Sequence, residues 1–268
     1  MTIESAAPWG HRKPRPLAKA CIELLRKRIA RGAAKAPLRS MLRHLGNEYD
    51  IEIDGVRLRC RMNDNYTEQM AIERDGHGNR QAIGLINAGL DAGDVFVDIG
   101  ANCGLFTVFA ARKVGPSGKV VAIEPIPEMV RRLKFNIAAN NYTNVVVAET
   151  AVGESAGEID IFVDATKYGH ASASIHDGIP HRVPVTPLLD ICRKAGVEAI
   201  AGIKIDIEGY EDRALIPFFE TAPVSMWPRQ IFIEIAQQSN WQRDLLAVLD
   251  GYGYRELWSS QSDVLLGR

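Results

Sequence analysis

The sequence predicts an α/β fold built on a mostly parallel β-sheet, and the regular alternation of two kinds of segment is the main reason. After Gly93, short apolar runs alternate with longer segments whose apolar residues recur at helical spacing. Short buried strands that alternate with helices of about 10–15 residues form parallel sheets with right-handed crossovers. The chain has 268 residues, of which 46% are apolar. It is therefore long enough to bury the core of such a sheet.

Residues 1–47 are expected to form a basic helical arm ahead of a main domain at 48–268. Over 17–45, apolar residues form one helical stripe and basic residues occupy the other side. Gly32 and Pro37 are expected to divide this segment into two pieces. The stripe consists of Leu17, Cys21, Leu24, Leu25 and Ile29. The simplest interpretation is a helix that packs its stripe on the main domain, and the alternative is a helix that binds a membrane surface or a partner.

Charge is distributed unevenly along the chain. Residues 1–45 hold 11 Lys and Arg but only Glu4 and Glu23 as acids, which gives a net charge of +9. The remainder carries −10, so the whole chain is close to neutral at −1. The acidic main domain is not expected to bind nucleic acid through charge. The arm is expected to contact an acidic surface or another subunit.

Residues 48–90 are expected to cover the main domain as a hairpin followed by a helix. Asp54-Gly55 separates two segments in which apolar and polar residues alternate, which is a strong signal for a β-hairpin. Residues 66–90 show helical spacing, with a turn expected at the Gly-His-Gly sequence of 76–78.

The remaining elements follow from the alternation. Strands are expected at 95–97, 120–123, 145–147, 158–163, 203–205 and 231–235. Helices are expected at 105–114, 127–137, 187–195 and 211–220. An antiparallel hairpin over 252–266 is expected to close the chain. Residues 164–182 are polar and hold three of the six His, which predicts a surface loop inserted in the domain.

Acidic residues stand at the ends of the expected strands. In open α/β sheets, ligands bind beyond the carboxyl ends of the strands. Because parallel strands end at one edge, these acids are expected to face a common site. In chain order they are Asp98, Glu124, Glu149, Asp206, Glu208 and Glu234.

A glycine loop follows the first of these strands. Gly100 and Gly104 of the segment DIGANCG let a ligand approach the backbone and let the chain turn into a helix. Glu124 lies 24 residues after Gly100. An acid at the second strand end, about 20 residues beyond a glycine loop, binds the two hydroxyls of a ribose. The combination predicts a nucleoside ligand.

The charges at this loop favour a cationic nucleoside over a dinucleotide. A pyrophosphate is bound by helix N–H groups and by Lys or Arg, but no basic residue occurs from Asp98 to Ala111. Asn102 interrupts the G-x-G-x-x-G pattern, and no Walker lysine is present. The ammonium and sulfonium of S-adenosylmethionine suit an acidic rim, with Asp98 near the ammonium and Asp206 facing the cation.

Four segments resemble the FkbM-type S-adenosylmethionine-dependent methyltransferases. They are FVDIGANCGLFT at 96–107, AIEPIPEMVRRLKFNI at 122–137, AVGE at 151–154 and IKIDIEGYE at 203–211. The resemblance covers roughly residues 95–235. It implies a Rossmann-like class I methyltransferase sheet of seven strands, with an antiparallel last strand and helices on both faces. It also implies transfer of a methyl group to a hydroxyl oxygen of a sugar or a secondary metabolite.

The same resemblance assigns residues to the cofactor. It implies that Asp98, Gly100 and Gly104 contact the methionine end. Glu124 is implied to bind the ribose, and Glu149 or its neighbours to approach the adenine. The full set expected to bind S-adenosylmethionine is Asp98, Gly100, Ala101, Asn102, Gly104, Glu124, Pro125, Glu149, Ala151 and Asp206.

Methyl transfer requires an aligned acceptor oxygen and a base that removes its proton. We expect Asp206 beside the methyl group, with Glu208, Glu234 or a loop histidine as the base, and His170 is the preferred histidine. Lys204 is expected to have a structural or interfacial role, because its side chain points opposite to its strand neighbours. Clustered carboxylates also bind Mg²⁺, but the sequence offers no decisive ligand set, and no metal ligand is assigned.

Two other functions share parts of this pattern. A nicotinamide-dependent oxidoreductase has the same strand, glycine loop and acid, but the incomplete glycine fingerprint and Asp98 disfavour it. A non-catalytic module with a retained fold is disfavoured by the intact DIGAN-x-G and IDIEG segments. The polar segments 48–90 and 164–182 favour a small hydroxylated acceptor, such as a sugar.

Cysteine usage and apolar run length bear on location. The four Cys form no C-x-x-C pair, and the apolar runs are too short for a membrane span or a secretory signal. A cytoplasmic protein with reduced thiols is therefore expected.

Overall fold

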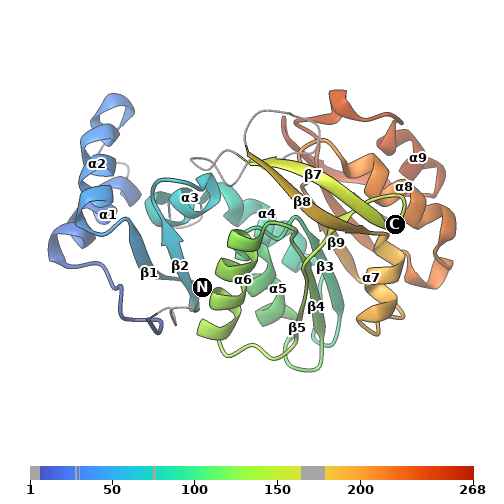
Figure 1. The fold of residues 1–268 in the computed structure, drawn as a ribbon, viewed down its shortest axis with the longest axis horizontal. Coiled ribbons are helices and arrows are strands. Elements are labelled where there is room, and N and C mark those ends of the chain that lie inside the picture. Colours follow the sequence, from blue (N-terminus) through green and yellow to red (C-terminus); the bar gives the residue numbers. More distant parts are fainter. Residues whose placement is uncertain (1–6, 28, 30, 75–76, 164–178) are drawn as a thin grey trace.

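A central sheet lies between two layers of helices, and the N-terminal helices extend from one end of the molecule (Figure 1). The computed structural model describes residues 7–27, 29, 31–74, 77–163 and 179–268.

The central sheet has seven strands in the order β11-β12-β10-β9-β3-β4-β5. β12 pairs antiparallel with β10 and β11, whereas the other neighbours in the sheet pair parallel. The predicted seven-stranded sheet with an antiparallel last strand is therefore confirmed. Strand order reverses between β3 and β9, which are neighbours. The strands are β3 (Val95–Ile99), β4 (Lys119–Ile123), β5 (Val145–Ala148), β9 (Gly202–Ile205), β10 (Gln230–Glu234), β11 (Arg255–Ser259) and β12 (Asp263–Gly267).

Alternate residues of these strands enter hydrophobic layers on opposite faces. Val97 and Ile205 pack in one layer, whereas Phe96 and Val120 pack in the other. The first face carries α7 (Leu188–Lys194), α8 (Glu211–Thr221) and α9 (Leu245–Gly251). The opposite face carries α4 (His77–Ala88), α5 (Leu105–Val114) and α6 (Pro127–Ala139). The prediction of helices on both faces is confirmed.

The N-terminal region shares one core cluster with the main domain. Leu25, Leu58 and Val108 lie in the same cluster, so the predicted boundary at residue 47 runs through a shared core. The hairpin turn at Asp54-Gly55 is present, with φ angles of 49° and 77° that a tight two-residue turn requires. The elements are α1 (Pro16–Arg26), the 3-10 turn η1 (Gly32–Ala34), α2 (Lys35–Leu45), β1 (Glu48–Ile53), β2 (Val56–Arg61) and α3 (Tyr66–Arg74).

Only part of the predicted apolar stripe is buried. Cys21 and Leu25 pack in this core, but Leu17, Leu24 and Ile29 are exposed. The expectation that the whole stripe packs on the main domain was wrong because only one side of α1 faces the core that it shares with α2 and α3.

The break within the basic arm differs from its prediction as well. The chain leaves helical structure before Gly32, as expected, but Pro37 lies inside the first turn of α2. A proline is tolerated there because the first helical N–H groups have no partner within the helix.

The turn predicted at 76–78 is in part wrong. The described part of α4 begins at His77, so His77 and Gly78 are helical. Residues 75 and 76 lie outside the described residues.

A second, small sheet replaces part of the predicted loop. Residues 179–182 belong to β8 (Ile179–Thr186), which pairs with β7 (Gly157–Val163) and β6 (Ala151–Val152). Pro180 and Pro184 conceal this strand in the sequence, because proline is rare inside strands. The rest of the predicted loop, 164–178, lies outside the described residues.

A buried ion-pair network joins α3 to α6. The side chain of Arg132 is 4% exposed, and its Nη2 lies 2.7 Å from Asp64 Oδ2. Its Nε lies 2.9 Å from Glu128 Oε1, and its Nη1 also pairs with Glu68. Burial raises the pKa of Glu68 to about 7 although Arg132 opposes this shift. The carboxylates of this network therefore depend on the Arg132 guanidinium as their countercharge.

We expect Arg132→Ala to lower the free energy of unfolding by about 3–5 kcal/mol at neutral pH, because it leaves buried carboxylates without a countercharge. Urea denaturation followed by circular dichroism measures this loss. Arg182→Ala is the matched control, since Arg182 forms an exposed pair with Asp160, and it should leave stability unchanged. Equal stability of the two variants would contradict the prediction.

Candidate functional site

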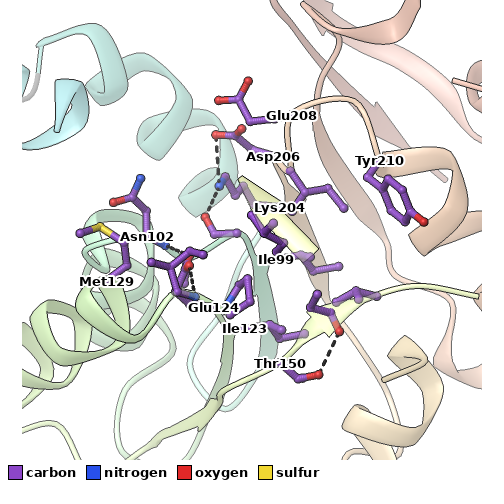
Figure 2. A pocket seen from close by; sticks show the side chains of 18 of the residues that line it. Ile99, Asn102, Ile123, Glu124, Met129, Thr150, Lys204, Asp206, Glu208 and Tyr210 are labelled. Carbon is purple, nitrogen blue, oxygen red and sulfur yellow. Dashed lines mark hydrogen bonds and ion pairs between the residues drawn. The ribbon is translucent and has the colours of Figure 1, made fainter. Parts of the chain in front are cut away.

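The carboxyl ends of the sheet strands open into one cavity where the strand order reverses. Side chains at the ends of β3, β4 and β9 surround it (Figure 2). Thr67 of α3 also lines it, so the N-terminal region contributes to the site. The small sheet supplies an apolar wall made of Ile159, Ile161 and Val185.

The glycine loop turns sharply at the end of β3. The backbone N–H groups of Gly100 and Ala101 both donate to Ile123 O at 3.0 Å. Gly100 has a φ of 74°, and a Cβ at this position would overlap the carbonyl oxygen of Asp206. The loop therefore requires glycine here for two reasons, the left-handed backbone and the close approach of the chain after β9. Gly100, Ala101 and Asn102 line the cavity, whereas Gly104 begins α5 against Leu133.

Glu124 is fixed at the end of β4 by two backbone groups. Its Oε2 accepts a hydrogen bond from Asn102 N at 2.8 Å, and its Oε1 accepts one from Ile126 N at 2.9 Å. The residue is buried and lines the cavity together with Pro125. Burial raises the pKa of Glu124 to about 7, against the opposing effect of the two N–H donors. The carboxylate therefore titrates near neutral pH.

Asp98 lies behind the loop rather than at the cavity surface. Its side chain is 0% exposed, and its Oδ2 accepts a hydrogen bond from Thr107 Oγ1 at 2.6 Å. Its Oδ1 has no hydrogen-bond partner within the described chain, and Lys204 Nζ lies 3.8 Å away. Burial raises the pKa of Asp98, while the Lys204 ammonium opposes the shift.

Lys204, for which a structural or interfacial role is expected, also lines the cavity. Its Nζ donates to Gly100 O at 2.9 Å and lies 3.4 Å from Asp206 Oδ2 (Figure 2). Burial opposes the charge, but the carboxylates of Asp206 and Asp98 outweigh burial, so the pKa of Lys204 is raised. The loop itself lacks a basic residue, as predicted, yet β9 places an ammonium against it. The sequence signal for this ion pair is Asp206, which stands two residues after Lys204 at the end of an otherwise apolar strand.

Acidic residues cluster beyond β9 and β10. Asp206 and Glu208 line the cavity, and Glu208 adopts a φ of 56°. Glu234 is the last residue of β10 and is not part of the cavity lining. Burial first, and then the carboxylates of Asp206, Glu208 and Glu211, raise the pKa of Glu234 to about 9. Burial and these neighbouring carboxylates therefore favour the protonated form of Glu234.

The turn that presents these acids is held by Glu211 at the start of α8. Glu211 is fully buried, and its Oε1 accepts hydrogen bonds from Ile207 N at 2.9 Å and Gly209 N at 3.2 Å. Its Oε2 accepts one from Trp241 Nε1 at 2.7 Å. The last acid of the IKIDIEGYE segment is thus a positioning residue for the turn.

One other predicted residue, Glu149, lies away from the cavity. The Glu149 side chain is 55% exposed and pairs with Lys134 Nζ at 2.5 Å. Its neighbours Thr150 and Ala151 line the cavity instead. His170 lies outside the described residues. Within the described residues, no group of three His, Cys, Asp or Glu is arranged to hold a metal ion.

Comparison with known proteins gives a family match. The model of the methyltransferase FkbM domain matches residues 98–256. The 31-O-demethyl-FK506 methyltransferase FkbM of Streptomyces tacrolimicus is 27% identical over 198 residues, which cover 62% of this chain and 74% of that protein.

Other relatives match over shorter stretches. A probable cobalt-precorrin-6B C(15)-methyltransferase of Sulfurisphaera tokodaii is 37% identical over 89 residues, 33% of this chain and 46% of that protein. The match therefore spans less than half the length of that relative. Among solved structures, a methyltransferase FkbM from Methylobacillus flagellatus aligns with a TM-score of 0.45 and 18% identity, over 93% of this chain and 58% of that chain.

We expect Gly100→Ala to lower the free energy of unfolding by about 2 kcal/mol or more, because a Cβ strains the left-handed backbone and overlaps Asp206. Thermal and urea unfolding measure the change. Gly84→Ala is the control, since a Cβ at Gly84 in α4 meets open space. Alanine there should stabilise the helix by up to about 1 kcal/mol. A Gly100→Ala protein as stable as the parent chain would refute the geometry of the loop.

Proposed function

The chain belongs to the FkbM methyltransferase domain family, and we propose that it transfers a methyl group from S-adenosylmethionine to a hydroxyl oxygen of a small polar acceptor, such as a sugar or a secondary metabolite. The observation that carries this proposal is the buried Glu124 carboxylate, which faces the cavity beside a glycine loop. The acids that follow β9 lie on the same cavity.

The residues present fit this cofactor. Glu124 offers carboxylate oxygens to the two ribose hydroxyls, and the apolar residues Ile126, Ile159 and Ile161 suit an adenine ring. The Lys204 ammonium suits the carboxylate of the methionine end, and Asp206 suits its cationic end. The bound cofactor would supply an electrophilic methyl group.

We propose that a carboxylate of the cavity removes the proton of the acceptor. Burial and the neighbouring carboxylates raise the pKa of Glu234 to about 9, which favours its protonated form and disfavours it as the base. Asp206 and Glu208 line the cavity and are the described candidates for the base. His170 remains a further candidate. A general base contributes about 10²–10⁴-fold to the rate.

The lining also bears on the acceptor. Asp206, Glu208 and Tyr210 present oxygen atoms that accept hydrogen bonds, and Thr67 adds a hydroxyl. Acceptor-rich walls suit a molecule with several hydroxyl donors and repel an anion. This supports a neutral, hydroxylated acceptor over an acidic one.

Two alternatives differ from this proposal in testable ways. Lys204 removes part of the charge argument against a nicotinamide-dependent oxidoreductase, but the family match favours the methyltransferase. A non-catalytic module would bind the cofactor without turnover. Binding of NADH would favour the oxidoreductase. Cofactor binding with no methyl transfer across a panel of sugars and glycosides would favour the non-catalytic module.

We expect micromolar binding of S-adenosylhomocysteine and a loss of about 10–100-fold in Glu124→Ala, because a charged group that receives hydrogen bonds contributes strongly to affinity. Isothermal titration measures both. Glu149→Ala is the matched control, since Glu149 follows the next strand but is exposed, and its affinity should equal that of the parent chain. No binding by the folded parent chain would refute the cofactor assignment.

The same affinity should depend on pH. The pKa of Glu124 is about 7, so the carboxylate form that accepts ribose hydroxyls is lost as pH falls through 7. We expect the affinity to fall by about tenfold from pH 8 to pH 6. Glu124→Gln cannot titrate and should bind weakly with little change over this range. A parent chain with flat affinity would contradict the role of Glu124.

Asp206→Asn should reduce kcat by about 10²–10⁴-fold if Asp206 serves the transfer step. Release of S-adenosylhomocysteine, measured with an acceptor found in the panel above, reports turnover. The control is Asp244→Asn, because Asp244 caps α9 away from the cavity. Near-normal turnover of Asp206→Asn, with normal cofactor binding, would remove Asp206 from the mechanism.

A further inference from the structure

The α1–α2 face, which we define as Leu17, Leu24, Ile29, Met41 and Leu45, is an apolar surface without a partner in the described chain. These side chains are 55%, 38%, 66%, 40% and 40% exposed, respectively. Large apolar side chains that gather on an exposed surface mark interaction sites.

One contact joins the two helices of this face. Cys21 Sγ lies 3.4 Å from Met41 Sδ, and Leu17 and Leu24 flank Cys21 at helical spacing on α1. Leu45 follows Met41 by one turn on α2. The other side of α1 is used already, because Ile22 and Leu25 are buried in the shared core. The exposed residues therefore form one surface that the fold itself does not cover.

The segment that carries this surface is basic, and Lys27 stands one turn after Leu24 of the face. From Arg12 to Leu45 the chain holds 11 Lys and Arg against the single acid Glu23. Lys19, Lys27 and Arg43 are exposed. Long basic side chains beside apolar ones place their charges at a polar boundary while their stems cover apolar surface.

We propose that the α1–α2 face binds the surface of an anionic lipid bilayer. Helices with an apolar face and Lys or Arg beside it lie in the membrane interface, and each basic residue near an anionic surface adds to the affinity. In the described chain no helix is long and apolar enough to cross a bilayer, so the attachment is peripheral. α1 and α2 lie at the end of the molecule far from α8 and α9 (Figure 1).

The acidic body of a second copy is a weaker match for this surface. Four acids of the body already pair with arginine on their own chain, which partly neutralises their charge. These pairs are Asp94–Arg229, Asp160–Arg182, Glu220–Arg243 and Asp250–Arg255.

Co-sedimentation of the full chain with vesicles tests the proposal. One set contains phosphatidylcholine alone, and the other adds phosphatidylglycerol. We expect binding to the anionic vesicles only, weaker at higher salt. The triple variant Lys19→Gln, Lys27→Gln and Arg43→Gln should bind about 100-fold more weakly, at about fivefold per charge. The double variant Leu17→Ser and Leu24→Ser should also lose binding.

Matched controls separate this face from general charge and apolar exposure. Lys113→Gln, Arg193→Gln and Lys194→Gln remove three exposed charges elsewhere, and Leu257→Ser removes an apolar side chain that is 64% exposed. Both controls should bind as the parent chain does, and circular dichroism confirms that every variant is folded. Equal binding to both vesicle sets, equal loss in the controls, or dimerisation through this face without lipid binding would each overturn the proposal.

Discussion

The ammonium of Lys204 is the group around which the candidate site is organised. It donates to the carbonyl of Gly100 and lies near the carboxylates of Asp98 and Asp206. A fully buried carboxylate without a countercharge would take up a proton or destabilise the fold, so Asp98 depends on this ammonium. The two acids keep the lysine charged in turn. The glycine loop after β3 and the chain after β9 meet because the Lys204 ammonium of β9 binds both of them, at Gly100 O and at Asp206.

The N-terminal region belongs to the same arrangement through α6. This helix begins at Pro127, shortly after Glu124, and its Arg132 pairs with Asp64, which precedes α3, and with Glu68 on α3. α3 in turn supplies Thr67 to the cavity. A shift of α3 would therefore disturb the lining and the segment that positions Glu124 together. The extra residues ahead of the sheet form a wall of the site as well as a surface of the molecule.

The fold could be predicted from the sequence because buried parallel strands leave a strong local signal, and the acids at their ends mark the ligand edge. β8 is not predicted because its residues Pro180 and Pro184 are typical of a loop. Its pairing partner β7 is also separated from it in the sequence, so no short turn signals the pairing. The exposure of Leu17 and Leu24 was missed because α1 has apolar residues on more than the side that packs. The sequence gives the position of Lys204 on its strand, but the carboxylates of Asp98 and Asp206 that surround its ammonium follow only from the fold.

The carboxyl groups of the cavity differ in protonation because each faces different neighbours. Glu124 faces two N–H donors, whereas Glu234 faces other acids, and burial raises the pKa of both, to about 7 and about 9. A cation beside these acids favours their ionised forms. In the proposed reaction, the acceptor hydroxyl would lose its proton as the sulfonium charge disappears, so the ionised acids would lose the support of that cation in the same step. Acidic groups that hold a proton more readily once the cation is gone would be suited to receive the acceptor proton, without a base that is strong beforehand.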